Sequence, residues 1–255
     1  MTPVLDAAGI TMTFSGIVAL DQLDLTVHEG ERVGLIGPNG AGKTTFFNCV
    51  LGVLRPDHGT VHLDGADVSH LRVHERARRG IGRTFQRIEL FGESTVREHL
   101  LIAERTRRGT GRLWKDLLGQ GRPHPDEIAA CDEVLDLLGL SDVAEEPIEH
   151  LSLGQGRLVE VGRALMTQPR LLLLDEPSSG LDRQETTDLA TTLRAVQAEQ
   201  GFAMLLVEHD VEFVSDFTER AYVLDFGCLI AEGPTGEVLQ SDAVRTAYLG
   251  NMKPA

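Results

Sequence analysis

A glycine-rich segment, Gly37-Pro38-Asn39-Gly40-Ala41-Gly42-Lys43-Thr44-Thr45, constrains the fold more than any other part of the chain. It fits the pattern G-x-x-x-x-G-K-[ST], follows the apolar residues 33–36 and opens a segment, residues 43–51, that we expect to be helical. Glycines in such a loop let backbone N–H groups turn around phosphate oxygens at the positive end of the helix. Lys43 is placed to reach the β- and γ-phosphates, and the Thr44 hydroxyl to hold Mg²⁺. This pattern predicts a nucleotide-binding α/β fold.

A second motif ends another apolar run. Residues 171–174 are all leucine, and Asp175, Glu176 and Pro177 follow them. Carboxylates at the C-terminal end of a parallel strand lie beside the phosphate loop in such folds, so Asp175 suits the Mg²⁺ shell. Strand alternation predicts that Glu176 points the other way, where it can polarise an attacking water. A solvated acidic turn would explain the motif equally well if the phosphate loop were absent.

The order of predicted elements supports a parallel sheet with helices on its faces. The start of the chain is rich in alternating apolar residues, and residues 71–140 have a helical, arginine-rich pattern that is interrupted at 107–125. Asp182 followed by Glu185 forms a capping-box pattern at the start of a helix. Strands are predicted at 10–14, 23–27, 33–36, 171–174, 202–207 and 221–224, a hairpin at 59–65, and helices at 43–51, 155–166, 183–199 and 242–249.

Composition narrows the class of protein. The 255 residues are 42% hydrophobic and carry a net charge of -15, which argues against a general nucleic-acid binder. No apolar run approaches the roughly 20 residues that cross a bilayer, and no signal peptide is expected at the N-terminus. Cys49, Cys131 and Cys228 are widely spaced, so we interpret them as reduced thiols of a cytosolic protein.

The charge is unevenly distributed. Residues 70–125 carry 13 Lys and Arg against 6 Asp and Glu, a balance of +7, whereas the rest of the chain has a balance of -22. One interpretation is a face near a membrane partner and anionic lipid, involving Arg105, Arg107, Arg108 and Arg112. The alternative is a solvated, arginine-rich helical surface.

Together with the two motifs above, further segments resemble the ATP-binding cassette (ABC) family, over about residues 5–249. They occur in the family's order along the chain. Gln86 is similar to the family's Q-loop glutamine, and Leu151-Ser152-Leu153-Gly154-Gln155 is similar to its signature. Ser178-Ser179-Gly180-Leu181-Asp182 is similar to the D-loop. His209 is similar to the switch histidine, and Phe14 is similar to the aromatic residue that stacks on adenine.

The resemblance implies a P-loop NTPase of ABC ATPase type in one domain, residues 1–255. Its parallel-sheet core would carry an antiparallel β subdomain and an inserted helical subdomain at about 88–165. ATP and Mg²⁺ are the expected cofactors. The residues expected to bind nucleotide are Phe14, Asn39, Gly40, Ala41, Gly42, Lys43, Thr44, Thr45, Ser152, Gly154, Gln155 and Asp182. Thr44, Gln86 and Asp175 would hold the metal, and Lys43, Gln86, Glu176 and His209 would act in catalysis.

Several of these residues have a simpler explanation. Ser152 is also a good helix N-cap, and His209 could be a histidine at the edge of the core. Phe14 could be an ordinary core aromatic, and Gln86 a solvated loop residue. Leu153 stands where many family members have glycine. A side chain at this position would alter the contact that the signature makes with a second subunit.

Several short segments of the sequence are similar to segments of the branched-chain amino acid importer ATPases. They are residues 83–86, 90–91, 208–210 and 247–250 and an extra stretch at about 104–125. Residues 74–80 are shared with the lipopolysaccharide-export ATPases, and a urea or short-chain amide importer is equally compatible. The resemblance implies a homodimer or a heterodimer with a similar ATPase, bound to transmembrane permease subunits at the inner face of the membrane. A soluble ABC ATPase acting on nucleic acid and a non-ABC P-loop kinase remain alternatives.

Overall fold

The computed structural model describes residues 3–84, 93–108 and 123–249. The chain divides into two compact units. The first comprises the described parts of Met1–Ile81 and Gly201–Ala255 together with Arg170–Ser178, and the second comprises the described parts of Gly82–Pro169 together with Ser179–Gln200. The predicted helical subdomain at about 88–165 falls within the second unit, which also includes residues 179–200; its boundaries stay a prediction.

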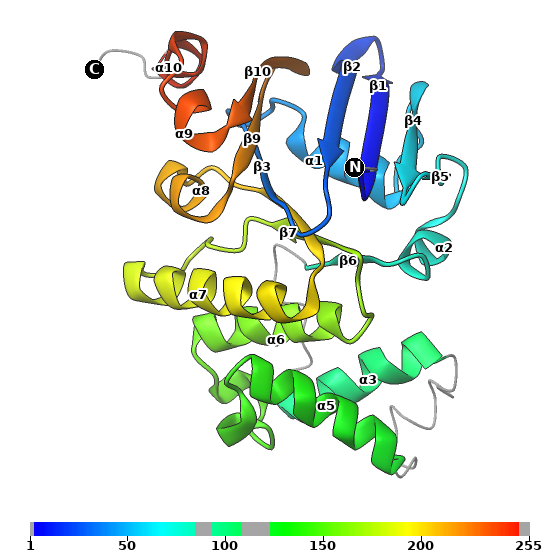
Figure 1. Cartoon of the computed structure of the whole chain (residues 1–255), viewed down its shortest axis with the longest axis vertical. Coiled ribbons are helices and arrows are strands. Elements are labelled where there is room, and N and C mark those ends of the chain that lie inside the picture. Colours follow the sequence, from blue (N-terminus) through cyan, green and yellow to red (C-terminus); the bar gives the residue numbers. More distant parts are fainter. Residues whose placement is uncertain (1–2, 85–92, 109–122, 250–255) are drawn as a thin grey trace. The chain divides into compact units, whose positions relative to one another are not determined.

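One sheet of the first unit is antiparallel. Its four strands are ordered β2-β1-β4-β5, and every neighbouring pair runs antiparallel (Figure 1). The strands are β1 (Leu5–Phe14), β2 (Ile17–Val27), β4 (His58–Leu63) and β5 (Ala66–Asp67). Leu5, Ile10, Leu23 and Val61 point into the core and are fully buried. This sheet corresponds to the apolar alternation at the start of the sequence.

The second sheet has the strand order β10-β9-β3-β8-β7-β6. Its strands are β3 (Arg32–Ile36), β6 (Ile81–Arg83), β7 (Leu171–Asp175), β8 (Ala203–Val207), β9 (Arg220–Asp225) and β10 (Cys228–Pro234). β3 runs parallel to β8 and β9, and β7 runs parallel to β8, whereas β10 is antiparallel to β9. The carboxyl ends of β3, β7 and β8 therefore lie along one edge of the sheet.

The described residues of the first unit also form five helices. They are α1 (Lys43–Leu51), α2 (Val73–Ala77), α8 (Val211–Phe217), α9 (Thr235–Val238) and α10 (Asp242–Leu249). Every residue of β7 and β8 is buried, as expected for parallel strands covered on both faces. Phe46 and Phe47 of α1 belong to the same core cluster as Leu35, Leu173 and Leu205.

A buried arginine holds the end of α1. The Arg76 guanidinium donates to the carbonyl oxygens of Cys49 and Val50, both at 2.7 Å, and to that of Ser69 at 2.9 Å. The last carbonyl groups of a helix lack intrahelical hydrogen-bond partners, and the Arg76 guanidinium supplies donors to them. Its positive charge also offsets the partial negative charge at the C-terminal end of the helix. Burial lowers the pKa of the Arg76 guanidinium below its ordinary value. The helix that follows the phosphate loop is thus anchored at its far end.

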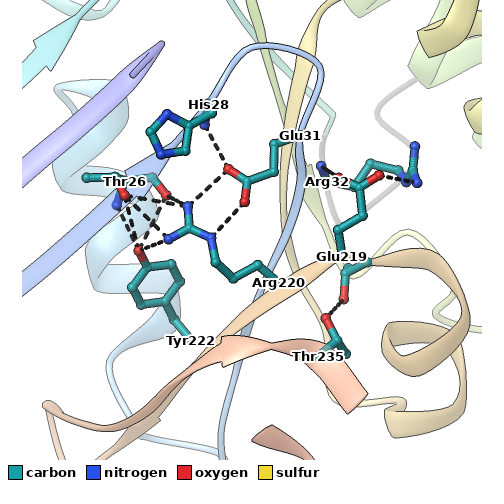
Figure 2. A network of polar contacts seen from close by, with 9 residues as sticks. Thr26, His28, Glu31, Arg32, Glu219, Arg220, Tyr222 and Thr235 are labelled. Carbon is teal, nitrogen blue, oxygen red and sulfur yellow. Dashed lines mark hydrogen bonds and ion pairs between the residues drawn. The ribbon is translucent and has the colours of Figure 1, made fainter. Parts of the chain in front are cut away.

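A second polar network joins the two sheets of the first unit (Figure 2). Arg220 of β9 pairs with Glu31 at 2.7 Å and 3.0 Å, and donates to the carbonyl oxygen of Thr26 in β2 at 2.7 Å. The Tyr222 hydroxyl accepts from Arg220 at 2.7 Å. Burial alone would raise the pKa of Glu31, but its hydrogen bonds with Arg220 and with the backbone of His28 outweigh that effect and lower it.

Four helices dominate the second unit. They are α3 (Val96–Arg108), α5 (Pro125–Leu137), α6 (Leu153–Leu165) and α7 (Arg183–Gln200), with short 3₁₀ turns at Ser141–Val143 and Ile148–His150. α3 contacts both α5 and α6, and α6 contacts α7 (Figure 1). A side chain at Gly162 of α6 would lie 2.9 Å from Leu138 and 3.5 Å from Leu100, so glycine permits this close packing. No helix in the described residues is long and apolar enough to cross a membrane.

The arginines at the end of α3 are paired. Arg107 and Arg108 both form ion pairs with the buried carboxylate of Glu104, and Arg105 pairs with Glu127 of α5 at 3.3 Å. The helical spacings of three and four residues bring the first two partners together. These three arginines are therefore not free surface cations, which weakens the interpretation of this segment as a lipid-facing patch. Arg112 lies outside the described residues.

We expect Glu31→Gln to lower the free energy of unfolding by about 1–3 kcal/mol at pH 7, because the pair with Arg220 loses its charge. The lowered pKa of Glu31 means that its stabilisation is present above the ordinary value of 4.5 and is lost as the pH falls through the folded-state value. The difference between wild type and variant should therefore shrink below about pH 4. Urea unfolding at several pH values measures this difference. The exposed Glu232→Gln is the control, and a constant Glu31→Gln deficit at all pH values would contradict the prediction.

Candidate nucleotide-binding site

The phosphate loop adopts backbone conformations that favour glycine. Gly37, Gly40 and Gly42 have φ values of 150°, 84° and 106°. A Cβ atom at Gly37 would lie 2.1 Å from the carbonyl oxygen of Leu224 in β9, and one at Gly42 would lie 2.6 Å from that of Ala19. Both neighbours are backbone atoms, so they cannot move aside cheaply. The loop is thus packed closely against two strands, with α1 beginning directly after it.

Lys43 lies beneath this loop. Its ammonium group donates to the carbonyl oxygens of Gly37 at 2.6 Å and Pro38 at 3.0 Å, and the side chain is buried. Burial lowers the pKa of Lys43, while the nearby charges of Glu176 and Glu208 act to raise it. The predicted phosphate-binding cation therefore shares its surroundings with two carboxylates from other loops.

The remaining predicted loop residues differ in access to solvent. Asn39, Gly40 and Thr44 are exposed, Thr45 is half-buried and Ala41 is buried. Backbone N–H groups in the first turn of a helix have no intrahelical acceptor, so this turn offers donors to an anion. These features fit the predicted cradle for phosphate oxygens.

Asp175 and Glu176 lie at the end of β7. Asp175 is the last residue of the strand and is buried. Glu176 has a positive φ of 47°, and its backbone N–H donates to the carbonyl oxygen of Val207 at 2.9 Å. Strand alternation is therefore the wrong reason for the direction of Glu176, because the strand has already ended and a left-handed turn directs the side chain. Such a conformation costs free energy and often marks a functional position.

His209 follows β8 and lies near Glu176. Its Nδ1 atom is 3.8 Å from Oε1 of Glu176 and 3.8 Å from Oε2 of Glu208. The imidazole is 56% exposed, so His209 is not a histidine of the core. Asp210 caps the next helix, α8, by accepting from the backbone N–H of Phe213 at 3.1 Å.

Phe14 ends β1 and is 43% exposed. The core alternative for this residue is therefore wrong, and an exposed ring is suited to stacking on a base. Its role in adenine binding stays a prediction.

The signature segment belongs to the second unit. The Ser152 hydroxyl accepts from the backbone N–H of Gln155 at 3.2 Å, and the Gln155 side chain accepts from the backbone N–H of Ser152 at 3.0 Å. This capping box starts α6, so Ser152 has the structural role that its type suggests. The backbone N–H of Gly154 donates a hydrogen bond to Oε1 of Glu185 in α7, with an N···O distance of 3.4 Å. Leu153 is exposed and lies close to Gly180 of the D-loop segment.

Asp182 caps α7. Its Oδ1 atom accepts from the backbone N–H of Glu185 at 2.8 Å, and the Glu185 carboxylate accepts from the backbone N–H of Asp182 at 3.1 Å. This is the capping box predicted from the sequence. Gln86 lies outside the described residues.

The structure gathers the predicted residues into two groups. Phe14, the phosphate loop, Asp175, Glu176 and His209 belong to the first unit, and among them the Lys43, Glu176 and His209 side chains come close together. Ser152, Gly154, Gln155 and Asp182 belong to the second unit. Glu208 was noted in the sequence only as part of the segment 208–210 that is similar to the importer ATPases, and it was not predicted as a site residue. A carboxylate directly after a fully apolar strand was a usable signal for such a role.

The donor chemistry fits Mg²⁺. This ion usually keeps several waters and takes one or two protein ligands together with substrate phosphates. Thr44 offers an exposed hydroxyl beside the phosphate loop, and Asp175 offers a carboxylate at the strand end. Among the described residues no group of three or more His, Cys, Asp and Glu side chains could form a metal site without such a substrate.

Comparisons with known proteins agree with this geometry. The sequence profile of the family described as ABC transporter matches residues 20–179. Over 251 residues the chain is 37% identical to the high-affinity branched-chain amino acid transport ATP-binding protein BraF of Pseudomonas aeruginosa, covering 97% of this chain and 98% of that protein. The lipopolysaccharide export system ATP-binding protein LptB of Haemophilus influenzae is 35% identical over 247 residues, 97% of each chain.

Solved structures give the same result. The crystal structure of the ADP conformation of an ATP-binding cassette of an ABC transporter matches with a TM-score of 0.89 at 32% identity, covering 98% of this chain and 100% of that chain. A nucleotide-free ATP-binding cassette from an ABC transporter matches with a TM-score of 0.85 at 30% identity, covering 96% and 98%.

The fold and the phosphate loop thus define a nucleotide-binding P-loop ATPase of mixed α/β architecture. The chain belongs to the ABC transporter family, as an ATP-hydrolysing subunit similar to branched-chain amino acid transport ATP-binding proteins.

We expect Gly37→Ala to destabilise the fold and to weaken ADP binding at least about tenfold, because a backbone clash with Leu224 adds to the cost of a positive φ. Gly16→Ala is the matched control. Gly16 also has a positive φ, 86°, but a Cβ atom there would meet nothing within 4 Å, so only about 1–2 kcal/mol of conformational strain is expected. Thermal unfolding and calorimetric ADP titration measure the two effects. Equal losses in both variants would contradict the prediction.

Proposed function

We propose that the chain hydrolyses Mg²⁺-bound ATP to energise a membrane permease that imports branched-chain amino acids or similar small polar solutes. The observation that carries this solute class is the 37% identity to BraF over nearly the whole length of both proteins. The relatives LivG of Salmonella typhimurium and of Escherichia coli, also described as high-affinity branched-chain amino acid transport proteins, are 38% and 37% identical over the same length.

The proposed chemistry is in-line attack of water on the γ-phosphate. Lys43 and the amides of the loop bind the phosphates, and Mg²⁺, when bound through Thr44 and Asp175, neutralises their charge. Glu176 orients the attacking water and accepts its proton. His209 contacts the γ-phosphate and keeps the water and Glu176 aligned. The 3.8 Å separation of the Glu176 and His209 side chains supports this assignment.

The site is completed by a second subunit in this proposal. ATP would lie between the phosphate loop of one copy and the Ser152-to-Gln155 segment of the other, with Phe14 stacked on adenine and Gln86 sensing the metal. The start of α6 supports this arrangement, because its helix N-terminus suits an anionic ligand. The second subunit is either another copy or a similar ATPase, and the assembly sits at the inner face of the membrane beside its permease.

A second candidate is an export system. The 35% identity to LptB over 97% of each chain favours it specifically. A urea or amide importer shares the importer architecture, and the net charge of -15 disfavours a role on nucleic acid. A non-ABC kinase is excluded by the family match.

Solute class is tested by affinity purification of the chain with its permease from the native membrane, followed by reconstitution in vesicles. ATP-dependent uptake of leucine, isoleucine or valine supports the proposal. Uptake of urea but not of these amino acids, or extraction of a lipid instead, would replace it with one of the alternatives.

We expect Lys43→Ala to reduce ATP affinity by at least about tenfold, because the cation nearest the phosphates is removed. Isothermal titration calorimetry measures the affinity. Arg55→Ala, at an exposed position in the loop that follows α1, is the control for loss of a positive charge. Unchanged affinity in Lys43→Ala would contradict the assignment of the phosphate loop.

We expect Glu176→Gln to retain ATP binding but to lower the hydrolysis rate at least about 100-fold, because an amide cannot accept the proton of water. The variant should accumulate as an ATP-bound dimer, detectable by size-exclusion chromatography with ATP. Glu212→Gln, an exposed change on α8, should behave as wild type. Wild-type turnover in Glu176→Gln would refute the assignment of Glu176 as the general base.

A further inference from the structure

Glu208 is a buried carboxylate that none of the roles above uses. It directly follows β8, and its side chain is 0% exposed. A buried charge of this kind is costly unless several hydrogen bonds compensate for it. The groups that donate hydrogen bonds to the Glu208 carboxylate therefore indicate its role.

Both carboxylate oxygens are occupied. Oε1 accepts hydrogen bonds from the backbone N–H of Ser178 at 2.9 Å and from the Ser178 hydroxyl at 2.6 Å. Oε2 accepts from the backbone N–H of His209 at 3.0 Å and, more weakly, from that of Asp210 at 3.4 Å. One oxygen thus binds the loop after β7, and the other binds the loop after β8.

These two loops carry the reacting groups of the proposed site. Glu176 is two residues before Ser178, with Pro177 between them, and the fixed φ of proline limits the freedom of this short connection. The backbone N–H of Glu176 also donates to the carbonyl oxygen of Val207 at 2.9 Å. Successive residues, Val207 and Glu208, therefore hold both ends of the Glu176-to-Ser178 segment.

The charge of Glu208 also reaches Lys43. It is one of two carboxylates, with Glu176, that act to raise the pKa of that buried ammonium group. The His209 Nδ1 atom lies 3.8 Å from Oε2 of Glu208 as well as from Glu176. Glu208 is thus bonded to the backbone of both loops and is electrostatically close to two groups assigned to ATP hydrolysis, Lys43 and His209.

We propose that Glu208 is a positioning residue that clamps the loop after β7 to the loop after β8, and so sets the separation between the Glu176 carboxylate and the His209 imidazole. This inference rests on the proposed function of those two residues. Glu208 does not touch ATP in this proposal. It acts through backbone hydrogen bonds that keep the base and the histidine in the arrangement needed for attack by water.

The clamp requires both the charge and the length of glutamate. An amide at this position could accept on one side only, and its NH₂ group would face an N–H donor on the other side. Aspartate keeps the charge but is one methylene shorter, so it cannot reach both loops. Ser178→Ala removes the hydroxyl partner and leaves the backbone N–H in place.

The test compares steady-state ATP hydrolysis and equilibrium ATP binding of the 255-residue chain carrying Glu208→Gln, Glu208→Asp or Ser178→Ala. We expect Glu208→Gln to lower kcat about 10- to 100-fold while ATP affinity stays within about threefold. Ser178→Ala should lower kcat less. The double variant Ser178→Ala with Glu208→Gln should lose less than the product of the two single losses, because both changes break the same link.

Thermal unfolding is measured for each variant, so that rates are compared where every protein is folded. Glu212→Gln, the exposed change on α8, is the matched control and should keep the wild-type kcat. A folded Glu208→Gln variant with wild-type kcat, or one whose ATP affinity and kcat fall in parallel, would overturn the positioning role. Absence of ATP hydrolysis in the wild type, or an unimpaired Glu176→Gln variant, would instead overturn the proposed function on which it rests.

Discussion

The parallel pairing of β3, β8 and β7 is the constraint on which the site depends. Val207, the last residue of β8, is paired with Leu35 of β3 on one side and with Asp175 of β7 on the other. Three strands therefore end at one level, about 4.8 Å apart from neighbour to neighbour. The phosphate loop, the Glu176 turn and the His209 loop leave the sheet together. A slip of one residue in either register would reverse the faces of a strand and separate these loops.

Charge compensation is the second constraint. Three ionisable groups, Lys43, Asp175 and Glu208, are buried near the strand ends, and each needs partners because low-dielectric surroundings penalise an isolated charge. Loop carbonyls hold the Lys43 ammonium group, and backbone N–H groups from two loops hold the Glu208 carboxylate. The site is thus built from hydrogen bonds between loops that are distant in sequence, which ties local loop geometry to the fold as a whole.

Much of the fold was predictable because local patterns were strong. The helix at 43–51 and the helix at 242–249 have the predicted bounds, and the strands at 171–175 and 203–207 differ from prediction by one residue. β6 was missed because three residues carry no detectable period, and β10 because its residues are mostly exposed or half-buried at a sheet edge. From the sequence, the arginines of α3 were interpreted as a charged face. The ion pair of Arg105 with Glu127 was not predictable, because it depends on the packing of α3 against α5.

The sequence by itself determined the chemistry of the phosphate loop, the acidic pair at the end of β7 and the family. Residue type and spacing were sufficient for these because the required glycines, lysine and carboxylates are local. Only the tertiary structure decided that Phe14 is exposed, that a left-handed turn directs Glu176 and that Glu208 joins two loops. The last two features depend on the contacts of Glu176 with Val207 and of Ser178 with Glu208, which join residues 31 and 30 positions apart and arise only when parallel strands align.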